Sequence, residues 1–223
     1  MIRALVFDLD DTLFPEREFV TSGFEAVDAW LRQSKSITGF LEAGIAAFNA
    51  GTRGTIFNAV LNRLGVSDKE ELILQMVEVY RNHVPKIHLF EDAASALGHY
   101  AGRKQLALLT DGYLRVQQRK VVALGIAHRF SAMVFSDEGG RGAWKPSPAP
   151  YRRLMNSLQR PGDECVYVGD NPAKDFVTAK ALGWHTVRVV REAGEYSLSL
   201  SPESHQADVT IHSLEELQNS IPD

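Results

Sequence analysis

The chain has a single cysteine among its 223 residues, Cys165, and therefore no internal disulfide. It also has no apolar stretch of the roughly 20 residues that a membrane-spanning helix requires. No charged leader followed by an apolar run and a cleavage site is found at its start. These absences predict a soluble protein of a reducing, cytoplasmic compartment with no membrane partner.

An excess of positive charge is absent as well. Lys and Arg number 24 against 28 Asp and Glu, which gives a formal net charge of −4 and a sequence pI near 6.0. A nucleic-acid partner is therefore not expected, whereas a local site for small anionic substrates stays possible. Hydrophobic residues make up 44% of the chain, enough for the core of one domain with or without an insertion. The oligomeric state is open between a monomer and a homodimer.

Short apolar runs alternate with segments of helical spacing along most of the chain. The apolar runs, each predicting a buried strand, comprise residues 2–7, 106–109, 132–135, 166–168 and 186–190. The segments with helical spacing are residues 92–100, 113–124, 148–158 and 172–182, the last with Gly183 as its C-cap. This alternation predicts an α/β fold, in which a Rossmann-like parallel sheet is sandwiched by helices.

The stretch between the first two predicted strands is too long for a single crossover helix. It contains four groups of apolar residues with helical spacing, separated by glycines and by a turn at residues 65–68. We therefore predict a helical subdomain over residues 15–85, inserted into an α/β core of residues 1–14 and 86–223. The aromatic residues expected to fill the core of this insertion are Phe24, Trp30, Phe40, Phe48 and Phe57.

The residues that could take part in chemistry lie after the predicted strands, most of them immediately after a strand. They are Asp8 and Asp10 after the first strand, Thr110, Asp111 and Gly112 after the second, Lys145 in the loop after the third, and Asp170 and Asp175 after the fourth. Parallel sheets bind ligands at the carboxyl ends of their strands. Acidic, hydroxyl and basic groups are therefore expected to meet at one edge of the sheet.

Such a set of groups suits the binding and transfer of a phosphoryl group. Converging carboxylates repel one another unless a cation offsets their charge, and oxygen ligands favour a hard ion such as Mg²⁺. Lys145 can hold an anion, and Thr110 with the N–H groups of residues 111–112 can receive phosphate oxygens. Asp8 offers a nucleophile, and Asp10, two residues on, lies on the same side of the strand.

Four short motifs carry a family resemblance. They are Asp-Leu-Asp-Asp-Thr-Leu at residues 8–13, Thr-Asp-Gly at 110–112, Lys-Pro at 145–146 and Gly-Asp-Asn-Pro-Ala-Lys-Asp at 169–175. In this order they resemble the four motifs of the haloacid dehalogenase superfamily. In that superfamily an insert after the first motif is a cap, usually a helical bundle, so the resemblance implies that residues 15–85 form such a cap.

The resemblance also implies a role for each motif residue. Asp8 would attack the substrate phosphorus, and Asp10 would protonate the leaving oxygen and then activate water. The residues that would bind phosphate are Thr110, Asp111, Gly112 and Lys145. Those that would ligate Mg²⁺ are Asp8 and Asp170 through their carboxylates and Asp10 through its backbone carbonyl. Asp175 would orient Lys145 or a metal-bound water without binding the ion.

Several of these residues also allow a structural interpretation. Asp11 is expected to be structural, as a turn or N-cap residue after the strand. Considered singly, Thr110 would be a cap of the following helix. Asp175 would be an acid in the first turn of a helix, favoured by the helix dipole, and Trp144 would be a packing residue. The polar residues of the insert that could recognise the leaving group are Glu16, Arg17 and Arg53, and the sequence does not choose among them.

We therefore predict a Mg²⁺-dependent phosphatase that removes phosphate from a small phosphorylated metabolite through an aspartyl-phosphate intermediate. A phosphomutase of the same superfamily is the nearest alternative, because it would use the same residues. A haloacid dehalogenase is less favoured, since the dehalogenases of the superfamily lack an acid at the place of Asp10. A non-catalytic phosphate-binding protein is also less favoured. The long insert after the first strand does not fit a phosphorylated receiver domain.

Overall fold

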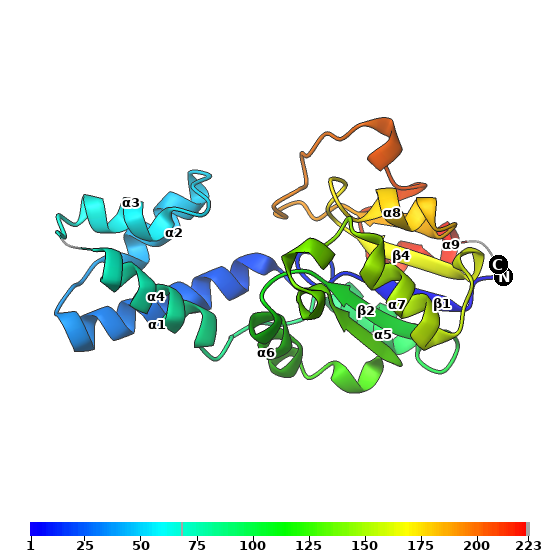
Figure 1. Cartoon of the computed structure of the whole chain (residues 1–223), viewed down its shortest axis with the longest axis horizontal. Helices are drawn as coiled ribbons and strands as arrows, with labels where there is room; N and C mark the ends of the chain where they lie inside the picture. The colour runs from blue at the N-terminus through cyan, green and yellow to red at the C-terminus, as the bar shows by residue number, and fades with distance from the viewer. Residues whose placement is uncertain (68, 222–223) are drawn as a thin grey trace. The chain divides into compact units, whose positions relative to one another are not determined.

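The computed structural model describes residues 1–67 and 69–221. The chain divides into two compact units, each held together by its own internal contacts (Figure 1). The first unit combines Met1–Glu16 with His88–Asp223, and the second is Arg17–Ile87. The division that we predict after residues 14 and 85 lies close to these boundaries, and the role of the insertion as a cap stays a prediction.

The first unit is built on an all-parallel sheet with the strand order β3-β2-β1-β4-β5-β6. Its strands are β1 (Ala4–Phe7), β2 (Gln105–Thr110), β3 (Ala132–Phe135), β4 (Cys165–Gly169), β5 (His185–Val189) and β6 (Val209–Ile211). The first five confirm the predicted strands and the α/β fold. β6 is not among the predictions, because its three residues include the exposed Thr210 and form no apolar run.

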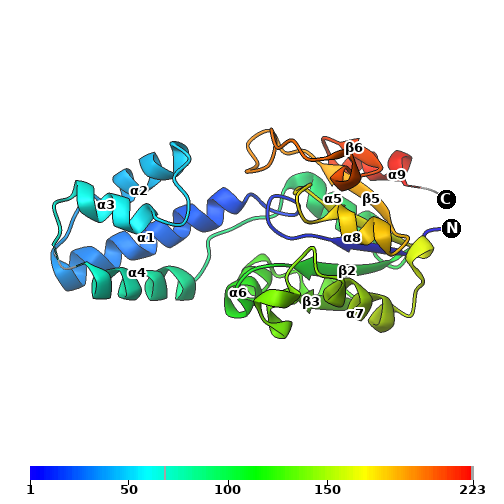
Figure 2. The ribbon, with the colours of Figure 1, turned by 45° about the horizontal axis from the view of Figure 1, so that its top comes forward.

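β1 is a central strand, with β2 and β3 on one side and β5 and β6 on the other in Figure 2. All four of its residues are fully buried, as expected of an apolar strand in a sheet that is covered on both faces. Phe7 pairs with Leu108 of β2 and with Val168 of β4, so these three strands end at nearly the same level. The polar residues that follow them consequently lie together.

Helices cover both faces of this sheet. They are α5 (Glu91–Tyr100), α6 (Leu114–Leu124), α7 (Pro148–Leu158), α8 (Phe176–Ala181) and the short α9 (Leu217–Ser220). Right-handed crossovers place α5 and α6 on one face and α7 and α8 on the other, where α7 and α8 contact each other. The predicted sandwich is thereby confirmed.

The start of α8 differs from the prediction of a helix over residues 172–182. Asn171 forms an Asx turn, in which its Oδ1 accepts the N–H of Ala173 at 2.9 Å. The N–H of Asn171 in turn donates to Asp175 Oδ2 at 2.9 Å. These side-chain bonds hold the segment before Phe176 as a loop, so the predicted start at residue 172 is wrong.

The second unit is a helical bundle. It contains most of α1 (Glu16–Lys35) together with α2 (Phe40–Asn49), α3 (Ile56–Arg63) and α4 (Glu70–Asn82). Phe24 and Phe40 are buried in its core, as predicted, and their rings pack edge to face with centroids 5.7 Å apart. Trp30, Phe48 and Phe57 are partly buried and pack against this core, so for these three residues the prediction is confirmed only in part.

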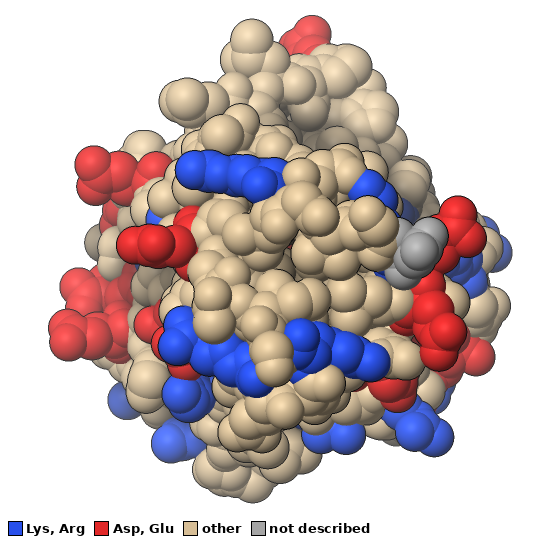
Figure 3. Space-filling view, turned by 90° about the vertical axis from the view of Figure 1, so that its left-hand side faces the viewer, with Lys and Arg blue, Asp and Glu red and all other residues tan. Residues whose placement is uncertain are grey.

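Charged side chains are interspersed on the face that Figure 3 shows. Lys and Arg form separate short groups there, with Asp and Glu towards the edges and neutral residues between them. In the part of the chain that the structure describes, no helix has both the length and the apolar character needed to cross a bilayer.

Candidate active site

The Asp8 carboxylate lies in a buried charge cluster at the carboxyl end of β1. The backbone N–H of Asp8 donates to the carbonyl of Val168 in β4 at 2.8 Å, which anchors the residue beside that strand. The Lys145 ammonium group donates to Asp8 Oδ1 at 2.6 Å, to Asp175 Oδ1 at 2.8 Å and to the Tyr167 hydroxyl at 2.7 Å. The side chain of Lys145 is fully buried. The structure thus brings three predicted site residues into direct contact.

Burial and charge oppose each other in this cluster. Burial raises the pKa of Asp8 from 3.8 to about 6, although the nearby charge of Lys145 acts in the opposite direction. Burial alone would lower the pKa of Lys145, but the carboxylates of Asp175 and Asp8 outweigh it and raise that pKa well above its ordinary value. Lys145 therefore stays charged, while ionised Asp8 keeps a residual cost of burial.

Asp170, directly after β4, adds a third carboxylate to the cluster. Carboxylate oxygens of Asp8, Asp170 and Asp175 lie within 4.8 Å of one another. Burial, followed by the charges of Asp175 and Asp8, raises the pKa of Asp170 well above its ordinary value. Within residues 1–67 and 69–221, the Asp170 carboxylate has no hydrogen-bond or ion-pair partner. Asp175, in contrast, uses one oxygen for Lys145 and the other for the N–H of Asn171.

This arrangement fits a hard divalent cation. The donor set contains oxygen atoms alone, which Mg²⁺ prefers over nitrogen and sulfur. The Asp170 carboxylate accepts no hydrogen bond from the described residues and lies beside Asp8 on a residue that is 6% exposed, so a cation or a proton is left to offset its charge. Because both oxygens of Asp175 are engaged, Asp8 and Asp170 are the carboxylates best suited to hold the ion.

Asp10 is held by two side chains of α6. Lys120 Nζ donates to Asp10 Oδ1 at 2.6 Å, and Gln117 Nε2 donates to Asp10 Oδ2 at 3.1 Å. Sequence reasoning found neither of these residues. The only signal available was their i, i+3 spacing on the helix that follows Thr110, which places both on one helix face.

The three residues after β2 have different environments. Thr110 is buried, and its hydroxyl donates to Gln117 Oε1 at 3.2 Å. The Asp111 carboxylate accepts the backbone N–H of Lys145 at 3.1 Å, so it positions the loop that carries this lysine. Gly112 has a φ of 123°, and a Cβ at this position would lie 2.5 Å from Gln117 Nε2. The backbone conformation therefore favours glycine here, and a larger residue would also have to displace the Gln117 amide.

Burial by itself would raise the pKa of Asp111, but the positive charges of Lys145 and Lys174 lower it below its ordinary value. Lys174 Nζ lies 3.2 Å from Asp111 Oδ2, and its side chain is 30% exposed. Sequence reasoning also missed Lys174, although it lies within the fourth motif next to Asp175. It adds a third positive charge to the site, more accessible than those of Lys145 and Lys120.

Asp11 has the structural role that we expected. Its Oδ1 accepts the N–H of Glu16 at 2.9 Å, and its Oδ2 accepts the N–H of Glu195 at 2.8 Å. It therefore connects the loop after β1 with the start of α1 and with the segment after β5. Trp144 is half-buried, and its ring packs edge to face against Tyr113 with centroids 6.3 Å apart, in agreement with the expected packing role. Its Nε1 donates to Asp137 Oδ1 at 2.9 Å.

The three candidates for recognition of the leaving group lie in both units. Glu16 belongs to the first unit, and burial together with the charge of Asp10 raises its pKa to about 7. Arg17 and Arg53 belong to the second unit. Their guanidinium carbons lie 5.9 and 3.9 Å from the centroid of the Phe48 ring.

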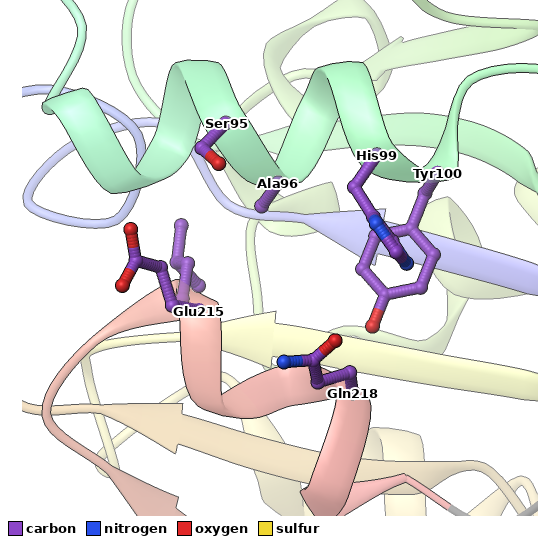
Figure 4. A pocket seen from close by; sticks show the side chains of 7 residues that line it. Ser95, Ala96, His99, Tyr100, Glu215 and Gln218 are labelled. Carbon is purple, nitrogen blue, oxygen red and sulfur yellow. The ribbon is translucent and has the colours of Figure 1, made fainter.

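A separate cavity of about 270 Å³ lies between α5 and the C-terminal segment (Figure 4). The residues that line it are Ser95, Ala96, His99, Tyr100, Leu214, Glu215 and Gln218. None of the predicted site residues is among them. The cavity is therefore distinct from the cluster around Asp8.

Residues 2–183 match the model of a family of hydrolases described as haloacid dehalogenase-like hydrolases. The chain belongs to this family. A glyceraldehyde 3-phosphate phosphatase of Methanocaldococcus jannaschii is 31% identical over 229 residues, which cover 99% of this chain and 97% of that protein. A phosphoserine phosphatase of Thermus thermophilus is 32% identical over 205 residues, or 89% of this chain and 79% of that protein.

A crystal structure of a haloacid dehalogenase-like hydrolase from Bacillus subtilis, bound to magnesium, has the same fold. It superposes with a TM-score of 0.72 at 19% identity and covers 98% of each chain. The family model and the two relatives confirm the predicted superfamily and the hydrolase class, and the superposition confirms the α/β fold.

Proposed function

We propose that this hydrolase is a Mg²⁺-dependent phosphatase that acts on a small phosphorylated metabolite through an aspartyl phosphate on Asp8. The observation that carries the proposal is the buried 2.6 Å contact between Asp8 and Lys145, with Asp170 alongside. Phosphoryl transfer requires a nucleophile and fixed positive charge around the transferring oxygens. The names of both curated relatives also support a phosphoric monoester hydrolase.

In the first step, an Asp8 oxygen attacks the substrate phosphorus, and the bond from phosphorus to the leaving oxygen breaks. Asp10 gives its proton to that oxygen. In the second step, Asp10 takes a proton from a water molecule whose oxygen attacks the aspartyl phosphate. Inorganic phosphate leaves, the Asp8 carboxylate is restored and Asp10 is protonated again.

The remaining predicted residues hold the transferring group. Lys145 offsets the charge of the phosphoryl oxygens, and Thr110 with the N–H groups of residues 111–112 receives them. Mg²⁺ would be held by the carboxylates of Asp8 and Asp170 and by the backbone carbonyl of Asp10. When bound, the ion offsets the negative charge of the phosphoryl group. Asp175 keeps Lys145 in position through their 2.8 Å contact.

The proposed substrate is a phosphate monoester of a small metabolite. Glyceraldehyde 3-phosphate and phosphoserine, which occur in the names of the relatives, are the first compounds to assay. Residues 15–85 are proposed to act as the cap that selects the substrate, with Glu16, Arg17 and Arg53 as candidates for recognition. A cytoplasmic location and a monomeric or homodimeric state stay predictions from the sequence.

The test is phosphate release by the purified protein with Mg²⁺, first from glyceraldehyde 3-phosphate and phosphoserine, then from a panel of sugar phosphates, nucleotide monophosphates and phosphoglycolate, with p-nitrophenyl phosphate as the generic control. Asp8→Asn should abolish release and keep the fold, whereas Asp163→Asn, at an exposed position, should retain full activity. Normal turnover by Asp8→Asn would contradict the assignment of Asp8 as the nucleophile. Conversion of a sugar phosphate into its isomer without free phosphate would instead identify a phosphomutase.

A further inference from the structure

Two neighbouring side chains of α6 hold both oxygens of Asp10. Lys120 Nζ lies 2.6 Å from Oδ1, and Gln117 Nε2 lies 3.1 Å from Oδ2. A carboxylate with a donor on each oxygen has one preferred rotation about its terminal bond. The direction in which Asp10 presents its oxygens is thus set by a helix 107 and 110 residues away in the chain.

Both partners are buried, with 4% of Gln117 and 3% of Lys120 exposed. A lysine is seldom buried to this degree unless a carboxylate accepts its charge. A surface ion pair would allow many geometries, whereas this buried pair allows few. The Lys120 ammonium group also lies 5.7 Å from the centroid of the Phe14 ring, which limits its freedom on another side.

Gln117 connects Asp10 to the proposed phosphate site. The Thr110 hydroxyl donates to Gln117 Oε1 at 3.2 Å, while Gln117 Nε2 donates to Asp10. One amide therefore keeps a fixed relation between a residue that would bind the phosphoryl group and the residue that would protonate the leaving oxygen. Gly112 leaves the space for this amide, because a Cβ there would lie 2.5 Å from Nε2.

We propose that Gln117 and Lys120 are positioning residues that aim Asp10 at the oxygen of the leaving group. The inference rests on the proposed phosphatase function. Lys120 at 2.6 Å and Gln117 at 3.1 Å hold the two oxygens of Asp10 from the same helix, so together they fix the orientation of its carboxyl group. Misplacing a catalytic group by about 1 Å can cost on the order of 10²-fold in rate, so losing either partner should weaken proton donation.

The test compares two probes of similar shape, p-nitrophenyl phosphate and phenyl phosphate. The p-nitrophenolate ion leaves without much help from an acid, whereas phenolate needs a proton more. The value of kcat/KM reports the steps up to the formation of the aspartyl phosphate. A defect in positioning Asp10 should therefore lower kcat/KM more for phenyl phosphate, and a general loss of structure should lower both values in proportion.

The variants are Lys120→Met and Gln117→Leu, with Asp10→Asn as the reference for a lost acid. Arg115→Met and Gln118→Leu, at exposed positions of the same helix, are the matched controls. We expect Lys120→Met to lose about tenfold more kcat/KM with phenyl phosphate than with p-nitrophenyl phosphate, in the direction of Asp10→Asn. Both controls should keep the wild-type ratio. If Lys120→Met does not fold, Gln117→Leu decides the same comparison.

An equal loss on both probes, or no loss, overturns the inference. This failure differs from a failure of the proposed function. In the latter case, the wild-type protein releases no phosphate, or Asp8→Asn stays active. With an active, Asp8-dependent wild type and an unchanged probe ratio in the folded variants, the phosphatase stands and the positioning role alone is wrong.

Discussion

Asp8→Asn should make the metal-free protein more stable at pH 8, although it removes the proposed nucleophile. The residue Asp8 is 4% exposed, and burial raises the pKa of its carboxyl group to about 6. Because this value lies above the ordinary 3.8, the native state binds the proton more tightly than the unfolded state does. The free energy of unfolding therefore falls as the pH rises from about 4 to about 6, and it stays lower above that range.

The size of the effect follows from the same pKa values. A rise from 3.8 to about 6 corresponds to about 3 kcal/mol, at about 1.4 kcal/mol for each pH unit. Asparagine keeps the shape of the side chain without its charge, and its carbonyl oxygen can still accept from Lys145. Lys145 also retains Asp175 as a partner at 2.8 Å. We thus expect Asp8→Asn to gain about 2–3 kcal/mol at pH 8, or about 5–10 °C in Tm for a chain of this length.

The measurement is urea unfolding in EDTA at pH 4 and pH 8, for the wild type, Asp8→Asn and the exposed control Asp163→Asn. The difference in the free energy of unfolding between Asp8→Asn and the wild type should be small at pH 4 and should reach its full expected value at pH 8. Adding Mg²⁺ should narrow it, because the proposed site binds the ion in the native state through Asp8. If Asp8→Asn is no more stable than the wild type at pH 8 in EDTA, burial does not dominate at Asp8 and the reasoning is refuted.

Three further substitutions test other parts of the structure. Asp175→Asn removes a charged partner of Lys145 and should lower kcat/KM for p-nitrophenyl phosphate about 10²-fold, with about 1–3 kcal/mol lost in urea unfolding. Gly112→Ala places a methyl group 2.5 Å from Gln117 at a φ of 123° and should cost about 1–3 kcal/mol in the same unfolding assay. Gly98→Ala, in α5 with no atom within 4 Å of the new Cβ, should raise the free energy of unfolding by about 0.5–1 kcal/mol.

The strands and the residues at their ends could be predicted because both depend on local sequence. A parallel strand that is buried on both faces must be apolar throughout. The apolar run before Asp8 therefore identifies this strand without any knowledge of the strands that pair with it. The carboxyl ends of parallel strands meet at one edge, which places Asp8 and Asp170 together whatever the details of packing. Asp11 was also assigned correctly, since an Asp after a strand often accepts nearby N–H groups.

Other features depend on contacts that no local pattern encodes. Lys120 and Asp10 are 110 residues apart in the chain, and their spacing carries no signal of the contact. The start of α8 was misplaced because Asn171 and Asp175 satisfy backbone groups through their side chains, an alternative to the helix that propensity does not reveal. β6 is absent from the sequence predictions for a related reason. This three-residue strand is defined by its pairing with β5 more than by its own residues.

The environment of Asp8 links the chemistry of the site to its cost in stability. The same burial that raises the pKa of Asp8 also removes water from around the group that must attack phosphorus. Lys145 contacts both Asp8 and Asp175, and Lys174 lies 3.2 Å from Asp111. Asp170 adds a further carboxylate within 4.8 Å of Asp8 and Asp175, so two lysines face four carboxylates. The cluster is therefore short of positive charge in the metal-free protein. A divalent cation would correct this imbalance, whereas a phosphate alone would add negative charge to it, so phosphate binding is expected to depend on the cation.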